Sequence, residues 1–88
     1  MVERTPTVWK IKIGIEKASE YGEVEVSNGD TVTIGSLDSG QNPLRVAFFK
    51  KSDGNEMTCT YAGGDNVADI TGAGTNIDCI YVAWGYKA

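Results

Sequence analysis

Three glycine-containing turns recur along this 88-residue chain, and the residues between them have the composition of β-strands. The turns are Asn28-Gly29, Asp53-Gly54 and Gly63-Gly64, each set between short runs of β-branched and aromatic residues. Asn-Gly and Asp-Gly tolerate positive φ at both central positions of a tight turn, which suits paired antiparallel strands. We therefore expect tight hairpin turns at Asn28-Gly29 and Asp53-Gly54, with positive φ at both glycines.

Apolar and polar residues alternate in several of the segments between these turns. In residues 7–15 every second residue is apolar, which is typical of a strand with one buried face. Residues 23–26 and 31–34 flank Asn28-Gly29 and form the clearest expected hairpin. Residues 16–22 are polar and fit either a loop or a single helical turn.

Two later strands are apolar on both faces. Residues 44–49 are apolar apart from Arg45, which predicts a central strand covered on both sides. Residues 77–86 are the most apolar stretch, with Cys79 and Tyr81 on one face and Val82 and Trp84 alternating on the other. The loop at 35–43, rich in Gly, Ser, Asp and Asn, is expected to cross between sheets.

These segments amount to about seven strands, spaced roughly 8 to 12 residues apart, as in sandwiches and barrels. The predicted fold is all-β, a small antiparallel β-sandwich or flattened barrel. Residues 1–6 are expected to form a flexible arm, and residues 7–88 a single β-sandwich domain. The side chains expected to be mostly buried are Trp9, Ile11, Val24, Val32, Val46, Phe48, Cys59, Ile80 and Val82.

Charge and hydropathy narrow the possible partners. The formal net charge is −4 and the eight basic residues are dispersed, which argues against binding to nucleic acid. No segment approaches the roughly 18 consecutive apolar residues that span a bilayer, so we expect no membrane partner. Residues 1–6 are polar and lack the apolar core of a signal peptide. We therefore expect that the protein acts where it is made, that it is released by lysis or packaged into a particle, or that a leader was removed.

The residues needed for catalysis or metal binding are scarce. The chain has no histidine, which removes the commonest general acid-base group and the commonest metal ligand. Two cysteines cannot supply the four ligands usual for zinc, and neither would have a histidine base. We expect no enzymatic activity, no metal and no cofactor.

Cys59 and Cys79 both fall on expected buried faces near the middle of strands. They fit two buried thiols, because free cysteine is among the most buried residue types. They also fit a disulfide that closes a loop of about 20 residues. The redox compartment decides between these alternatives.

The aromatic residues Trp9, Tyr81, Trp84 and Tyr86 are candidates for an interface. Aromatic residues on a strand are usually core, but an exposed row can stack on sugar rings or dock a neighbouring subunit. A small domain can cover only part of a strand that is apolar on both faces. We therefore expect a homo-oligomer, or a protein that works inside a larger assembly.

Residues 28–86 resemble small all-β virion structural proteins of tailed phages and of archaeal viruses or proviruses. The resemblance rests on an NGDTVTI-type hairpin, an apolar FFKKSDG strand and turn, MTCTYAGGDNV, and the ending GAGTNIDCIYVAWGYKA. It implies a protein that coats, cements or decorates a capsid or tail lattice and assembles as an oligomer in the virion, after synthesis in the host cytoplasm. It carries no catalytic residues.

Two functions follow as expectations. The first is a non-enzymatic structural or assembly protein, a viral particle component that acts through self-association. The second is a small binding module, for carbohydrate or a protein ligand, that uses exposed Trp9 or Trp84 with acidic loop residues.

Overall fold

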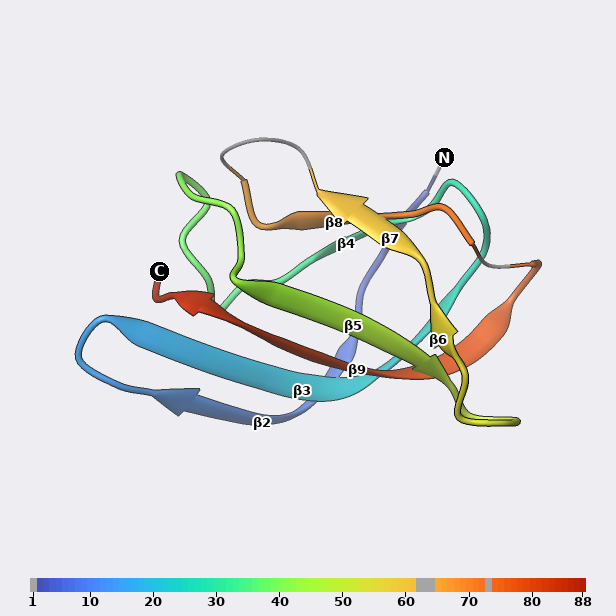
Figure 1. The fold of residues 1–88 in the computed structure, drawn as a ribbon, viewed down its shortest axis with the longest axis horizontal. Coiled ribbons are helices and arrows are strands. Elements are labelled where there is room, and N and C mark those ends of the chain that lie inside the picture. The colour runs from blue at the N-terminus through green and yellow to red at the C-terminus, as the bar shows by residue number, and fades with distance from the viewer. Residues whose placement is uncertain (1, 62–64, 73) are drawn as a thin grey trace.

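The computed structural model describes residues 2–61, 65–72 and 74–88, and over these residues the chain forms nine strands and no helix (Figure 1). The expected all-β fold is confirmed. The strands are β1 (Glu3–Arg4), β2 (Thr7–Ile13), β3 (Lys17–Val26), β4 (Thr31–Thr33), β5 (Arg45–Lys50), β6 (Glu56–Met57), β7 (Cys59–Tyr61), β8 (Val67–Ile70) and β9 (Ile77–Tyr86).

The strands form two sheets that pack face to face. The larger sheet has the order β2-β3-β9-β5-β6 and the smaller one the order β1-β4-β8-β7. The chain passes from one sheet to the other between β1 and β2, and again between β6 and β7, so the sheets are joined along both edges as in a flattened barrel (Figure 1). The pairs are antiparallel, apart from the parallel pair of β1 with β4.

Strands β3 and β9 form the centre of the larger sheet. They pair antiparallel over ten residues each, from Lys17 opposite Tyr86 to Val26 opposite Ile77. Burial alternates along both strands, so that one face of the pair looks into the core and the other looks outward. The polar appearance of residues 16–22 had predicted a loop or helical turn, which is wrong. The buried residues there include Glu20, a carboxylate where a strand pattern would have an apolar side chain.

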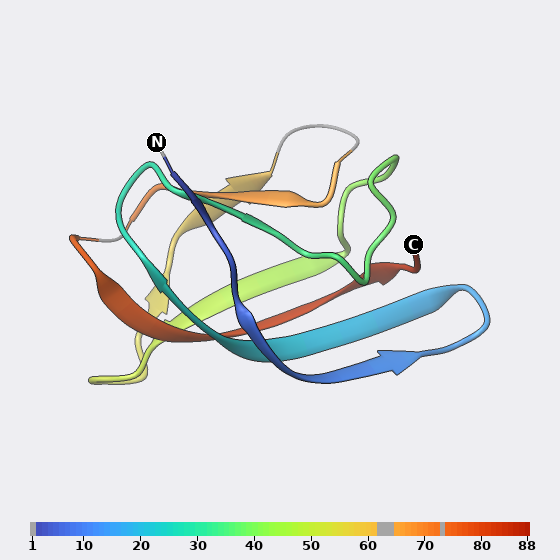
Figure 2. The same cartoon turned by 180° about the vertical axis from the view of Figure 1, so that it is seen from behind.

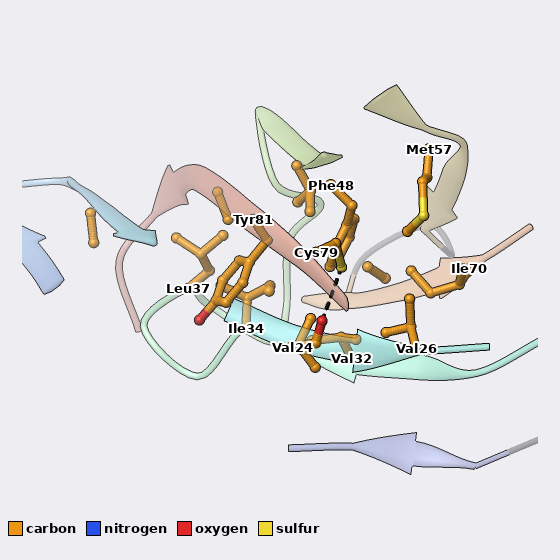
Figure 3. Packing of buried hydrophobic residues seen from close by; sticks show 14 residues of the cluster. Val24, Val26, Val32, Ile34, Leu37, Phe48, Met57, Ile70, Cys79 and Tyr81 are labelled. Carbon is orange, nitrogen blue, oxygen red and sulfur yellow. Dashed lines mark hydrogen bonds between the residues drawn. The ribbon is translucent and has the colours of Figure 1, made fainter. Parts of the chain in front are cut away.

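The core lies between the two sheets. Val24 and Val26 of β3 and Cys79 and Tyr81 of β9 face residues of the smaller sheet such as Ile70 (Figure 3). The rings of Phe48 and Tyr81 stack with their centroids 5.9 Å apart.

The predicted core is correct in the middle of the fold and wrong at one edge. Burial is confirmed for Val24, Val32, Val46 and Phe48, whereas Cys59 and Ile80 are only half-buried. The prediction was wrong for Trp9, Ile11 and Val82, which are 49%, 48% and 39% exposed. Val82 lies on the outer face of β9, because Cys79, Tyr81 and Ala83 take the inner face. β2 is an edge strand, and all seven of its residues are exposed.

A β-bulge in β2 also changes which of its side chains share a face. The register with β3 shifts between Val8 and Lys10, so that Val8 lies opposite Gly22, Lys10 opposite Tyr21 and Ile11 opposite Glu20. Gly22 permits this close approach: a Cβ at this position would lie 2.1 Å from the carbonyl oxygen of Thr7. Strict alternation placed Trp9 on the same face of the strand as Ile11. The bulge puts Val8 on that face instead.

The two Gly turns differ in what they connect. Gly29 and Gly54 have φ of +90° and +77°, as expected. Asp53-Gly54 joins the antiparallel pair β5 and β6, so that hairpin is confirmed. Asn28-Gly29 joins β3 to β4 in the other sheet, so the expected hairpin is wrong: β3 has β2 and β9 on its two sides, and β4 pairs with β1 and β8. The third expected turn, Gly63-Gly64, lies outside the described residues.

The N-terminal segment is part of the fold, not the expected flexible arm. β1 pairs with β4, and Arg4 forms ion pairs with Asp30 at 2.7 Å and Glu25 at 3.3 Å. The backbone amide of Ser27 and the Arg4 guanidinium hold the pKa of Asp30 below its usual value. The domain boundary expected at residue 7 is therefore not seen, because Arg4 ties the first strand to the turn that follows β3.

Replacing Gly29 by valine should destabilise the fold by about 1 kcal/mol or more, because a β-branched residue is strained at positive φ. A shift of roughly 4 to 8 °C in melting temperature is the corresponding readout for a domain of this size. Gly35→Val is the matched control, since a Cβ at Gly35 also meets open space but its φ is not in the positive range. Equal melting temperatures for the two variants would contradict the prediction.

Candidate interaction surfaces and a buried hydrogen-bonded carboxylate

The candidate interface residues do not lie on one surface. Trp9 and Trp84 are 49% and 47% exposed, Tyr86 is half-buried, and Tyr81 is fully buried. Tyr81 was therefore wrongly grouped with the interface. It sits on the inner face of β9, where its ring fills the core beside Phe48.

A row of exposed apolar side chains crosses the outer face of the larger sheet. Tyr21 of β3 lies directly opposite Val82 of β9, and Trp84 is the next outward residue along β9. Tyr21 and Val82 are each 39% exposed. Directly opposed side chains in an antiparallel pair are close enough to contact each other, so these three residues make one patch, which we call the outer patch. Sequence reasoning missed Tyr21, because its segment was expected to be a loop.

Lysines border the outer patch at one end of the sheet. Lys10 lies opposite Tyr21, and Lys12 lies opposite Ser19, whose other neighbour is Trp84. Neither lysine has an ion pair within the part of the chain that the structure describes. Lys17 lies beyond them, with its ammonium 5.4 Å from the centre of the Tyr86 ring.

Acidic side chains lie at the other end of the same face. Glu23 is opposite Ile80, and Glu25 is opposite Asp78. Glu23 forms an ion pair with Lys51, and the Glu23 carboxylate raises the pKa of that lysine. The outer face therefore runs from basic at the β2–β3 turn, through the apolar patch, to acidic at the start of β9.

A groove lies on the inner side of β2. The β2–β3 hairpin projects beyond the strands of the smaller sheet in both views (Figures 1 and 2), and the inner side of β2 borders a cavity there. Val8, Ile11 and Ile13 form one wall of a cavity of about 490 Å³, and Ser36 and Lys87 belong to the opposite wall. Sequence reasoning expected this apolar face of β2 to be core. The alternating Lys10 and Lys12 were the available sign of an edge strand, because lysines on edges discourage unwanted pairing.

Glu20 lies at the floor of this groove, and only 2% of it is exposed. Its carboxylate accepts hydrogen bonds from the Ser36 hydroxyl and backbone amide and from the Tyr81 hydroxyl. Burial first, and then the Glu20 carboxylate, raise the pKa of Tyr81 well above its usual value. These bonds attach the loop after β4 to the centre of the larger sheet. Sequence reasoning did not single out Glu20, since it resembled any other acid in a polar segment.

Both cysteines are free thiols in the structure. Cys79 is buried and donates a hydrogen bond to the carbonyl oxygen of Val24 at 3.1 Å (Figure 3). Cys59 is half-buried, and its sulfur lies 3.6 Å from the carbonyl oxygen of Val46. Burial raises the pKa of both thiols, to about 11 for Cys79. A raised pKa lowers the thiolate fraction at neutral pH, so neither position has the features of a reactive cysteine.

Over residues 2–61, 65–72 and 74–88, no three histidine, cysteine or acidic side chains converge in a way that could hold a metal ion. No helix in the described chain is long and apolar enough to cross a membrane. The described residues thus present apolar and charged contact areas on the surface. The buried cluster around Glu20 has its hydrogen bonds made within the protein.

Comparison with known proteins gave no match of any kind: no family model, no curated protein and no solved structure is significantly similar to this chain.

Tyr81→Phe should destabilise the fold by about 1 to 3 kcal/mol, because the buried Glu20 carboxylate loses a hydrogen-bond donor that water cannot easily replace. Chemical denaturation at neutral pH measures the loss. Tyr86→Phe is the control, since its hydroxyl makes no hydrogen bond among the described residues and its ring is retained. The role of the Glu20 cluster would be refuted if both variants were as stable as the parent protein.

Alkaline pH should weaken the fold through Cys79. A raised folded-state pKa means that the fold favours the thiol, so this contribution is complete below pH 9 and declines as the pH rises from 9 to about 11. Cys59 and Tyr81 shift in the same direction and add to the decline. Cys79→Ala should lose less stability over this interval than the parent, measured by denaturant titration at several pH values. Parallel curves for the two proteins would rule out this role.

Proposed function

We propose that this chain is a non-enzymatic assembly protein that associates with copies of itself through the outer patch. The observation that carries the proposal is the row formed by Tyr21, Val82 and Trp84, which are between 39% and 47% exposed on the outer face. Contiguous apolar patches are uncommon on monomeric proteins unless they serve an interaction, because their contact with water is unfavourable.

The charges around the outer patch favour one arrangement of two copies. Two larger sheets packed face to face about a two-fold axis bring the patch of one copy onto the patch of the other. If the strands of the two sheets run in opposite directions, Lys10 and Lys12 of one copy face the acidic end of the other, near Glu23 and Asp78. If the strands run in the same direction, like charges meet. Electrostatic complementarity thus selects the antiparallel arrangement.

A viral particle is the setting that we propose for this assembly. The resemblance of residues 28–86 to small all-β virion proteins supports it, together with the lack of histidine and of a described metal-binding cluster. In that setting the protein decorates, cements or forms a minor part of a capsid or tail, and contacts to the lattice add to contacts between copies.

Val82→Glu should convert the associated protein to a monomer, because it places a charge in the centre of the outer patch. Light scattering after size-exclusion chromatography, over a range of micromolar concentrations, measures the mass. Ile15→Glu is the matched control: it makes the same type of change at a residue that is 90% exposed and lies in the β2–β3 turn, away from the patch. Circular dichroism checks that both variants are folded.

A parent protein that stays monomeric throughout, or a Val82→Glu variant that associates as strongly as Ile15→Glu, would overturn the proposal. A further variant carrying Lys10→Glu and Lys12→Glu separates the two possible arrangements. It should weaken association if basic and acidic ends face each other, and leave association unchanged if the lysines face one another, because glutamate then faces glutamate.

A second candidate is a small binding module for carbohydrate or a protein ligand. The half-exposed rings of Trp9 and Trp84 favour it, since exposed aromatic rings stack on sugars and on apolar ligand groups. Titration with soluble oligosaccharides, followed by tryptophan fluorescence, tests it: a saturable change that Trp84→Ala abolishes supports this function, and no change argues against it.

A further inference from the structure

β2 combines a free edge with an uncovered apolar face. It pairs with β3 along one side, and no other strand of the described residues pairs with its other side. Because alternate residues of an antiparallel strand direct their backbone amide and carbonyl groups to the same neighbour, half of the polar backbone groups of β2 point away from β3. Such an edge accepts an added strand from another chain.

The groove next to that edge supplies space for side chains of an added strand. Val8, Ile11 and Ile13 are 42%, 48% and 65% exposed and line the cavity of about 490 Å³ on the inner side of β2. A sixth strand beside β2 would direct every second side chain over this apolar wall, and those side chains gain most if they are apolar.

Glu20 does not change the apolar character of the groove. Its carboxylate already accepts hydrogen bonds from Ser36 and Tyr81, so it does not need a bound ligand to supply hydrogen-bond donors. Its effect is to hold Ser36 and the loop around it in place as the far wall. The groove is thus a preformed apolar slot and not a site for a cation.

The outward face of β2 determines which side chains of the added strand are favourable on the side away from the groove. Lys10 and Lys12 lie there without ion pairs in the described chain, on the face opposite to the groove. Pairing of β2 with β2 of a second copy is unfavourable, because an antiparallel pair centred on Ile11 sets Lys10 directly against Lys12. Acidic side chains at these positions of the added strand would instead form cross-strand ion pairs.

We propose that β2 binds an extended segment of another protein in which acidic residues alternate with apolar residues, and that this segment pairs as a sixth strand of the larger sheet. Its apolar side chains enter the groove over Val8, Ile11 and Ile13, and its acidic side chains lie beside Lys10 and Lys12. The groove and the free edge of β2 lie apart from the outer patch, whereas Lys10 and Lys12 border both surfaces and are shared by the two proposed interactions.

The probe is a fluorescently labelled synthetic peptide of alternating valine and glutamate with blocked ends, titrated with the full chain and followed by fluorescence polarisation. We expect saturable binding that weakens as salt is raised, because the lysine contacts are exposed. Two control peptides should bind weakly: one of alternating valine and lysine, and one with the same valines and glutamates arranged in two blocks, which has no period of two.

Substitutions in the chain test whether the glutamate peptide binds at β2. The double variant with Lys10→Glu and Lys12→Glu should lose affinity for the glutamate peptide by about tenfold or more and gain affinity for the lysine peptide. Lys50→Glu, which makes half of this change in net charge, is the control for charge alone, since Lys50 lies at the end of β5, away from β2. Val82→Glu, which cannot associate through the outer patch, should bind the glutamate peptide at least as tightly as the parent, which separates this site from the outer patch.

Hydrogen exchange gives the location directly. Amides of β2 should become protected when the glutamate peptide is bound, and those of β9 should not change. The proposal is overturned if the parent protein does not bind the glutamate peptide, or if it binds the block peptide equally well. It is also overturned if the double variant keeps its preference, or if protection appears on β9 and not on β2.

Discussion

The antiparallel pair of β3 and β9 is the interaction on which the rest of the structure depends. It runs for ten residues on each strand, and both β2 and β5 are placed by pairing with it. Its inner face supplies Val24, Val26, Cys79 and Tyr81 to the core, against which the short strands of the smaller sheet pack. Those strands are two to four residues long and would not be stable without this surface.

Two polar clusters fix the smaller elements onto that pair. Glu20 reaches from β3 through the core to Ser36 and Tyr81, and so positions the loop that crosses between the sheets. Arg4 joins β1 to Asp30 at the turn between β3 and β4. A buried carboxylate is unfavourable unless its hydrogen bonds are satisfied, so each cluster restricts the chain to one arrangement of its loops.

The same construction leaves two surfaces unsatisfied, and the proposed interactions follow from them. The smaller sheet covers only the inner face of the larger one, so the outer patch around Val82 stays in contact with water. The hairpin of β2 and β3 projects beyond the smaller sheet (Figure 2), and the apolar residues on the inner face of β2 border a cavity. One surface is suited to packing sheet on sheet, and the other to adding a strand.

The sequence by itself determined the all-β class, the positive φ at Gly29 and Gly54, and burial at Val24, Val32 and Phe48, because these depend on local turn chemistry and on an alternation of period two. Only the tertiary structure decided which strands pair. Asn28-Gly29 has the chemistry of a hairpin, but β3 gains a ten-residue partner in β9, and β4 lies in the other sheet. Likewise, the apolar residues of β2 and the outer face of β9 fit a core strand in pattern. Burial of the first depends on the extent of the opposite sheet, and burial of the second depends on whether a further layer packs against it. No local pattern contains either.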